Sequence, residues 1–152
     1  LENKKICKAE LQKMLGLPEK DVPMIAMITR LVSHKGLDLV KAVAEDILHE
    51  DVQFVLLGTG DAEYENYFRD LGRRYEGKTA INIAFNGDLS RKIYSGADIF
   101  LMPSVSEPCG LSQMIASRYA TVPVVRETGG LYDSIKPYGA GGNGDGLPVH
   151  CP

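Results

Sequence analysis

The stretch Glu107-Pro108-Cys109-Gly110-Leu111-Ser112-Gln113 separates an apolar run that ends at Met102 from a second apolar run at 122–125. Between them, apolar residues recur at helical spacing from about 111 to 119. The order strand, loop, glycine, helix, strand is typical of a βαβ unit in a parallel sheet. A glycine at the start of a helix leaves backbone N–H groups unpaired, and the helix dipole adds positive potential. We therefore expect this turn to bind an anion such as phosphate.

Glu107 lies on the loop just before this expected anion site. An ionised carboxylate only accepts hydrogen bonds, so a functional Glu107 is expected to contact hydroxyl groups or a cation rather than phosphate. A site that holds phosphate with amides and hydroxyls with a carboxylate suits a sugar nucleotide. The alternative interpretation is a capped helix with a Glu107 side chain that faces solvent.

The same alternation extends in both directions along the chain. Strands are expected at 24–28, 53–57, 80–85, 98–102 and 122–125. Helices are expected at about 4–15, 37–49, 62–75, 89–95, 111–119 and 131–135, with a glycine-rich loop over 138–146. The run from Met24 to Ile28 is apolar on both faces, as in a buried parallel strand. The predicted fold class is α/β, a doubly wound Rossmann-like parallel sheet of at least five strands.

Composition limits the function classes. The chain has 152 residues, enough for one domain with a core, and its net charge of −3 argues against a nucleic-acid partner. No apolar run reaches membrane-spanning length and no signal peptide precedes the first strand, so no membrane partner is expected. The three cysteines, Cys7, Cys109 and Cys151, form no close pair, which predicts neither a disulfide framework nor a zinc site. A cytoplasmic location is the resulting expectation.

Polar or glycine-rich clusters follow the predicted strands at 30–36, 58–61, 85–87, 104–113 and 126–130. In doubly wound sheets, ligands bind at the carboxyl ends of the strands beside the point where the strand order reverses. Because the carboxyl ends of parallel strands share one edge of the sheet, these clusters are expected to form a single site.

Arg30 and Lys35 flank the loop after the first predicted strand. A guanidinium fork and a mobile ammonium together suit diphosphate recognition, although two solvated surface cations are the alternative. Gly58 and Gly60 open the sequence G-T-G-D-A-E, which lacks the third glycine of the Rossmann dehydrogenase fingerprint.

Phe85, the pair Gly129-Gly130 and Cys109 each have two interpretations. Phe85 ends the third predicted strand, where its ring either packs on a nucleotide base or belongs to the core. Gly129 and Gly130 precede a short predicted helix and form either a second amide cradle or a tight turn. Cys109 lies near a helix start that would stabilise a thiolate, but no base is adjacent in sequence, so a packed thiol is expected.

Four stretches carry a resemblance to a known family. They are T-R-L-V-S-H-K-G-L-D at 29–38, L-L-G-T-G-D at 56–61, E-P-C-G-L-S-Q at 107–113 and R-Y-A-T-V-P-V-V-R-E-T-G-G-L at 118–131. From about residue 23 to 135, the chain resembles the C-terminal half of bacterial glycogen synthases and plant-type starch synthases. These are retaining glucosyltransferases of the GT-B fold that use ADP-glucose.

The resemblance implies roles for the residues that match. Arg30 and Lys35 would hold the diphosphate of ADP-glucose, and Glu107 would meet the hydroxyls of the transferred glucose. These three are the implied catalytic residues. The implied substrate-binding residues are Gly58, Gly60, Phe85 (against the adenine), Cys109, Gly110, Leu111, Ser112, Gly129 and Gly130. Protein cations would supply the positive charge, so neither a divalent metal nor another cofactor is expected.

The chain also departs from the family pattern. Val105 and Ser106 replace a usual Arg-Phe, Ala120 replaces a usual glycine, and Ala84 and Phe85 replace a usual Gly-Tyr. The acceptor-side domain of the family has no counterpart here. Residues 1–152 are therefore expected to be one truncated nucleotide-sugar-binding domain that is inactive alone and meets its α-1,4-glucan acceptor through the missing domain. The family resides in the cytoplasm, or in plastids in plants.

Two other functions remain open at this point. The donor could be UDP-glucose or another sugar nucleotide, or the chain could be a non-catalytic module that binds nucleotide or glucan. A fold alone does not choose among these functions.

Overall fold

The structure is a computed structural model that describes residues 2–105, 111–126 and 147–149. Its sheet has six parallel strands in the order β3-β2-β1-β4-β5-β6. The strands are β1 (Met24–Ile28), β2 (Gln53–Leu57), β3 (Thr79–Asn82), β4 (Ile99–Met102), β5 (Val122–Arg126) and β6 (Leu147–Val149). The predicted α/β class with a doubly wound parallel sheet is confirmed, and β6 is a strand that the sequence pattern did not predict.

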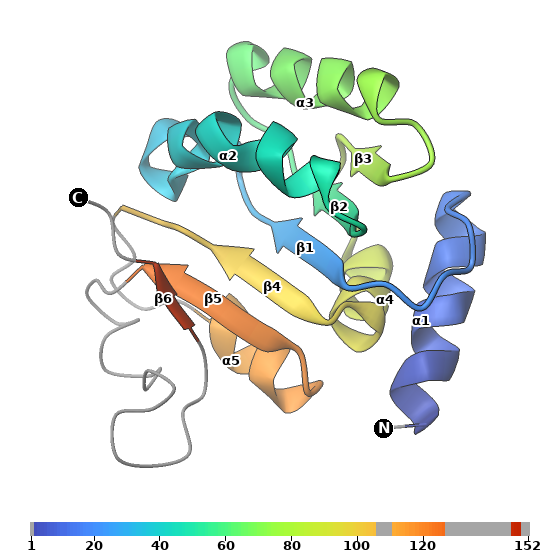
Figure 1. The fold of residues 1–152 in the computed structure, drawn as a ribbon. Helices are drawn as coiled ribbons and strands as arrows, with labels where there is room; N and C mark the ends of the chain where they lie inside the picture. The colour runs from blue at the N-terminus through green and yellow to red at the C-terminus, as the bar shows by residue number, and fades with distance from the viewer. Residues whose placement is uncertain (1, 106–110, 127–146, 150–152) are drawn as a thin grey trace.

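Helices cover both faces of this sheet (Figure 1). They are α1 (Glu2–Leu15), α2 (Leu37–His49), α3 (Ala62–Arg74), α4 (Gly87–Gly96) and α5 (Ser112–Arg118), with a 3₁₀ turn, η1, at Ser33–Lys35. Helices α2 and α3 lie on one face, and α4 and α5 lie on the other (Figure 1). This division follows from right-handed crossovers that run outward in opposite directions from the centre of the sheet.

Alternation along the strands divides the core into two layers. In β2, Val55 and Leu57 belong to the layer that includes α1, α4 and α5, whereas Phe54 and Leu56 belong to the layer beneath α2 and α3. Successive side chains of a strand point to opposite faces, so a strand buried on both sides must be apolar throughout. Each such buried side chain stabilises the fold by about 1.5–3 kcal/mol.

Helix α1 crosses α4 closely at Gly96. A Cβ at Gly96 would lie 2.9 Å from Leu11 Cδ2 and 3.1 Å from the Cys7 carbonyl oxygen. Glycine at this position therefore lets the two helices approach, and the nearly buried Leu11 fills the contact.

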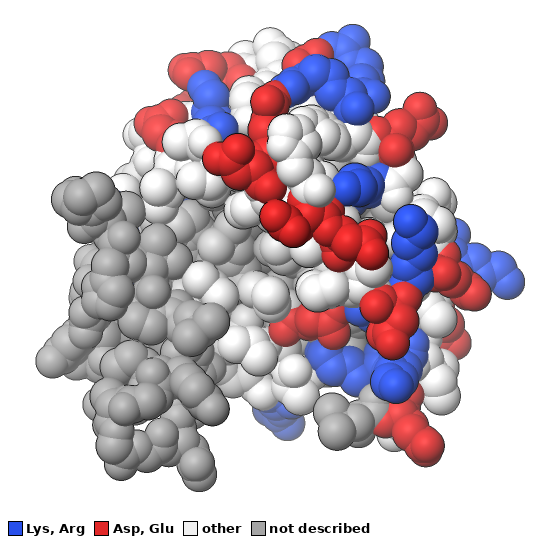
Figure 2. Space-filling view, in the orientation of Figure 1, with Lys and Arg blue, Asp and Glu red and all other residues white. Residues whose placement is uncertain are grey.

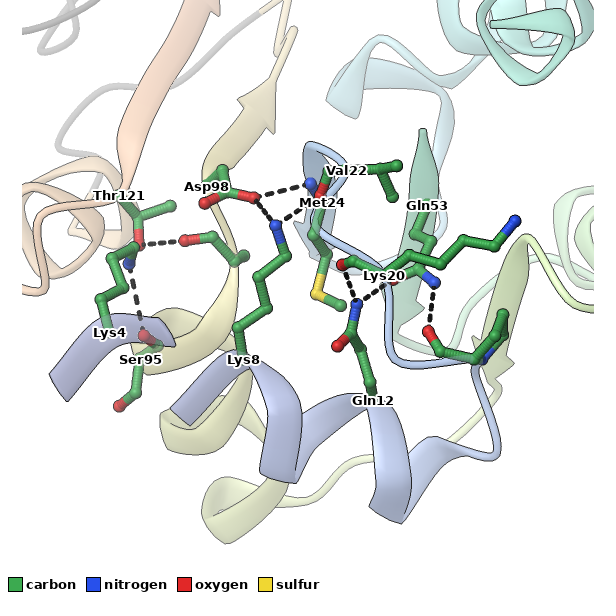
Figure 3. A network of polar contacts seen from close by, with 12 residues as sticks. Lys4, Lys8, Gln12, Lys20, Val22, Met24, Gln53, Ser95, Asp98 and Thr121 are labelled. Carbon is green, nitrogen blue, oxygen red and sulfur yellow. Dashed lines mark hydrogen bonds and ion pairs between the residues drawn. The ribbon is translucent and has the colours of Figure 1, made fainter. Parts of the chain in front are cut away.

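Two lysines of α1 fasten this helix to the amino ends of the strands (Figure 3). Lys8 Nζ donates to Asp98 Oδ2 over 2.6 Å, and the same oxygen accepts the Met24 amide at 2.8 Å. Lys4 Nζ donates to Thr121 Oγ1 over 2.8 Å, and burial lowers the pKa of Lys4. Because these contacts join α1 to β1 and to the residues just before β4 and β5, α1 is an integral part of the domain.

A buried pair of glutamines extends this network. Gln12 Nε2 donates to Gln53 Oε1 over 2.7 Å, and Gln53 Nε2 donates to the Pro18 carbonyl oxygen over 2.9 Å (Figure 3). Both side chains are only 2% exposed. The hydrogen bond between them, together with those to the Lys20 and Pro18 carbonyl oxygens, offsets the cost of removing amide groups from water.

Acidic and basic side chains are intermingled over the face that carries α2 and α3 (Figure 2). Lys41 and Glu63 form an ion pair at 3.2 Å, and Arg73 and Asp70 form another at 3.3 Å. Exposed pairs of this kind contribute about 0–1 kcal/mol each. None of the helices in the described part of the chain has the length and apolar content needed to cross a membrane.

The third strand differs from its predicted extent. It was expected at 80–85 but spans Thr79–Asn82, because β2, its one neighbour strand among the described residues, ends at Leu57, which pairs with Asn82. The chain beyond residue 82 leaves the sheet. The helix predicted at 131–135 and the loop predicted at 138–146 lie outside the described residues.

Candidate functional site

A cavity of about 190 Å³ opens at the carboxyl ends of β1 and β4. The chain proceeds outward from β1 through β2 to β3 and then returns to β4 on the other side of β1, so the strand order reverses at this point. Arg30, Lys35, Ser104 and Ser112 supply polar side chains to its lining. Reversal points of this kind are where doubly wound sheets bind ligands, and the predicted polar clusters at 30–36 and 104–113 meet here.

Arg30 and Lys35 both reach this cavity, as the sequence predicted. Arg30 is exposed, and no described residue forms an ion pair or side-chain hydrogen bond with its guanidinium. Lys35 is half-buried at the end of η1. A cavity with two cations at its rim attracts an anion, because field lines from both charges converge in a recess with low-dielectric walls.

Ser112 brings the start of α5 to the same cavity. Leu111 precedes the helix without any side-chain cap, and its own side chain is 66% exposed. Behind Ser112 lies the buried Tyr94: burial raises the pKa of Tyr94, and a hydrogen bond from the Ser112 side chain opposes that rise. Ser112 thus lies near Tyr94 and also lines the cavity.

The loop after β2 is paired to the loop after β1 along their backbones. The Leu31 amide donates to the Thr59 carbonyl oxygen, and the Asp61 amide donates to the Leu31 carbonyl oxygen, both over 2.8 Å. A Cβ at Gly58 would lie 1.9 Å from the Thr29 oxygen, and a Cβ at Gly60 would lie 2.3 Å from the Leu31 oxygen. These glycines therefore allow the two loop backbones to approach each other. This packing requires glycine at both positions whether or not a ligand is bound.

A second cavity of about 210 Å³ adjoins the first, and Arg30 and Thr29 line both. It lies against Gly58 at the end of β2 and against Phe85 in the loop after β3. The Phe85 side chain is 98% exposed, so the interpretation of Phe85 as a core residue is wrong. A fully exposed ring on the rim of a cavity can pack against a planar ligand.

Asn86 explains how this loop is held. Its side-chain oxygen accepts hydrogen bonds from the Asp88 and Leu89 amides, each at 3.0 Å, and so caps α4. The cap anchors the loop at its carboxyl side and leaves Phe85 in front of the first turn of the helix.

Five predicted site residues lie outside the described residues. They are Glu107, Cys109, Gly110, Gly129 and Gly130. Within the described ranges, no three His, Cys, Asp or Glu side chains gather closely enough to hold a metal ion.

Ser104 begins the predicted polar cluster at 104–113 but was not among the predicted site residues; it lines the first cavity and is 2% exposed. It follows Pro103 at the carboxyl end of β4, so its place after a buried strand was the available signal. Nothing in the neighbouring sequence distinguishes a serine that lines a site from a serine that only forms a turn.

The chain matches the family model of glycosyl transferases group 1 over residues 8–145. It is 56% identical over 155 positions to a glycogen synthase of Kosmotoga olearia, covering 100% of this chain and 33% of that protein. It is 54% identical to a glycogen synthase of Clostridium acetobutylicum, covering 91% of this chain and 29% of that protein.

Among solved structures, the chain is similar to the catalytic domain of starch synthase IV from Arabidopsis thaliana, determined with ADP and acarbose bound. The two share 36% identity with a TM-score of 0.84, over 92% of this chain and 29% of that one. The chain therefore spans about a third of the length of the curated relatives that it matches.

Proposed function

Because this chain belongs to the glycosyl transferases group 1 family, we propose that it is the donor-binding domain of an α-1,4-glucan synthase. In this proposal the enzyme transfers glucose from ADP-glucose to the non-reducing end of a glycogen- or starch-like chain, with retention of configuration. The observation that carries the proposal is the meeting of Arg30, Lys35 and Ser112 around one cavity at the carboxyl ends of β1 and β4. The similarity to named glycogen synthases supports the choice of substrate class.

The first cavity takes the diphosphate of the donor. Arg30 offers a planar guanidinium that no described side chain engages, and Lys35 offers a point charge from the opposite end of the same loop. When the bond between the anomeric carbon and the diphosphate oxygen breaks, negative charge grows on the diphosphate. Cations already in place stabilise this charge without reorganisation, which lowers the barrier.

The second cavity takes the nucleotide base. Its walls include Ile28, Leu57 and Ala84, and the exposed ring of Phe85 stands at its rim. The two cavities share Thr29 and Arg30, so they are adjacent. One nucleotide can therefore place its base in the second cavity and its diphosphate in the first. Base–aromatic packing contributes about 1–3 kcal/mol to binding.

The remaining roles rest on sequence resemblance. Glu107 contacts the glucose hydroxyls, while backbone amides around Cys109, Gly110 and Gly129-Gly130 line the sugar and diphosphate. The glucan acceptor binds a second domain, so the 152-residue chain alone is proposed to transfer no glucose. The protein works in the cytoplasm, a location that cell fractionation tests.

Titration calorimetry of the 152-residue chain with ADP, UDP and maltose tests the donor assignment. The proposal expects ADP to bind more tightly than UDP, and both to bind more tightly than maltose. Preference for UDP would instead indicate a different sugar-nucleotide donor. Affinity for maltose with no nucleotide binding would indicate a glucan-binding module and would refute the proposal.

No divalent metal takes part in the proposed reaction, because Arg30 and Lys35 supply the positive charge. In an enzyme of full length that carries this chain, EDTA should leave glucose transfer from ADP-glucose unchanged. Loss of transfer with EDTA and recovery with Mg²⁺ would contradict this part of the proposal.

A further inference from the structure

We propose that Gly36 is a positioning residue: its missing side chain lets residues 30–36 pack directly on the chain after β4, and this contact places Lys35 relative to Ser104 and Ser112. The inference rests on the proposed function, in which this cavity takes the donor diphosphate. Gly36 itself does not line the cavity.

The contact between the two loops is a backbone contact. A Cβ at Gly36 would lie 1.9 Å from the Pro103 carbonyl oxygen and 2.7 Å from the Pro103 carbonyl carbon. Both distances are far inside the roughly 3.5 Å at which carbon atoms pack favourably. Because the opposing atoms belong to the backbone, a side chain at Gly36 would have to push the whole Pro103 segment away.

A hydrogen bond reinforces the same contact. The Val105 amide, two residues after Pro103, donates to the carbonyl oxygen of His34, two residues before Gly36, over 2.9 Å. The loop after β1 and the loop after β4 are therefore joined at two points on either side of Ser104, which is buried. Lys35 lies between these points in sequence, so its backbone cannot shift without breaking one of them.

The backbone conformation of Gly36 is left-handed, with φ +74°, which also favours glycine. Gly16 and Gly77 share this conformation, with φ +73° and +87°, but a Cβ on either would meet no atom within 4 Å. The chain thus contains matched controls that separate backbone strain from the contact with Pro103.

The decisive variants are Gly36→Ala, Gly36→Asn, Gly16→Ala and Gly77→Ala in the 152-residue chain. Asparagine tolerates the left-handed conformation better than alanine but carries the same Cβ. If the contact with Pro103 matters, Gly36→Asn weakens ADP binding as much as Gly36→Ala does. If only backbone strain matters, Gly36→Asn binds ADP as tightly as the original chain.

Two measurements are made on each folded variant: ADP affinity by calorimetry and hydrogen exchange of the Val105 amide. We expect both Gly36 variants to weaken ADP binding by about tenfold or more, as for a misplaced binding group. They should also exchange the Val105 amide faster, while the controls keep ADP affinity within about twofold of the original chain. The amides of β2 serve as an internal reference for global stability.

Wild-type ADP affinity in folded Gly36→Ala, or its recovery in Gly36→Asn, would overturn the inference. If Gly36→Ala does not fold, Val105→Pro decides, because it removes the donor to His34 without adding a Cβ at Gly36. Weaker ADP binding by Val105→Pro supports the inference, and unchanged binding refutes it.

If the original chain fails to bind ADP, the proposed function fails by itself. Val105 exchange then still tests the loop contact: faster exchange in both Gly36 variants supports it, and unchanged exchange refutes it.

Discussion

Lys8 donates to Asp98 over 2.6 Å and so ties α1 to the residue just before β4, 90 positions away in the chain. The Lys8 side chain is only 12% exposed, and the same Asp98 oxygen also accepts the Met24 amide. The Asp98 side chain is 37% exposed. Because the lysine is shielded and the same carboxylate also fixes the start of β1, the pair is still expected to contribute more than a surface ion pair.

Lys8→Met should lower the free energy of unfolding by about 1.5–3 kcal/mol, the usual worth of a hydrogen bond to a charged group. The control is Arg73→Met, which breaks the exposed pair with Asp70 and should change stability by less than about 0.5 kcal/mol. Urea unfolding of both variants measures the difference. Equal effects would mean that the Lys8–Asp98 pair behaves as a surface pair.

Arg30→Ala should lower kcat about 10²–10³-fold in an enzyme of full length, as for the loss of one preorganised donor to the transition state. Lys35→Ala is expected to behave in the same way. Arg73→Ala, which removes an exposed cation from α3, is the control and should keep activity. A change confined to KM would mean that these cations bind substrate and transition state equally, contrary to their proposed role at the leaving group.

Phe85→Ala should weaken ADP binding by about 1–3 kcal/mol because a stacking surface for the base is lost. The midpoint of thermal unfolding should not change, since the ring is 98% exposed. Phe85→Tyr keeps the ring and should keep ADP affinity. A fall in stability near the roughly 3–5 kcal/mol expected for the buried Phe68→Ala would show that Phe85 packs in the core after all.

Ala120→Gly should raise the free energy of unfolding by about 0.5–1 kcal/mol. Ala120 follows the C-cap of α5, Tyr119, in the left-handed conformation, with φ +56°, and its amide donates to the Ser117 carbonyl oxygen over 3.0 Å. Glycine is the usual residue at such a helix end. Ala42→Gly on the exposed side of α2 is the opposite control and should lower stability by about 0.5–1 kcal/mol. Thermal unfolding of both variants compares them, and a loss of stability in Ala120→Gly would contradict the explanation.

Glu107→Gln should reduce kcat/KM for ADP-glucose in an enzyme of full length while ADP affinity stays nearly unchanged. A lost charge-assisted hydrogen bond to a sugar hydroxyl costs on the order of 1.5–3 kcal/mol, and ADP has no such glucose. Calorimetry measures the affinity for ADP, and steady-state kinetics measures kcat/KM for ADP-glucose. Equal losses for both ligands, with a lower unfolding temperature, would assign Glu107 to bracing its loop instead.

Much of the fold could be predicted because its signals are local. The run from Met24 to Ile28 is apolar throughout, and the structure places it as β1, buried between β2 and β4. The helix predicted at 37–49 has the same bounds in the structure because Gly36 precedes it and its apolar residues recur at helical spacing. Arg30, Lys35 and Ser112 could be assigned to one site because carboxyl ends of parallel strands share one edge of the sheet.

The sequence by itself determined the alternation of strands and helices, the edge of the sheet where the candidate site lies and the two cations that line its cavity. Periodicity and turn residues act within a few positions of the chain, so a single sequence displays them. Only the tertiary structure decided that Phe85 leaves the sheet, that Lys8 meets Asp98, and that Gly58 and Gly36 lie against backbones of other loops. These contacts join segments far apart in the chain, and the close approach that requires a glycine exists only once those segments have packed together.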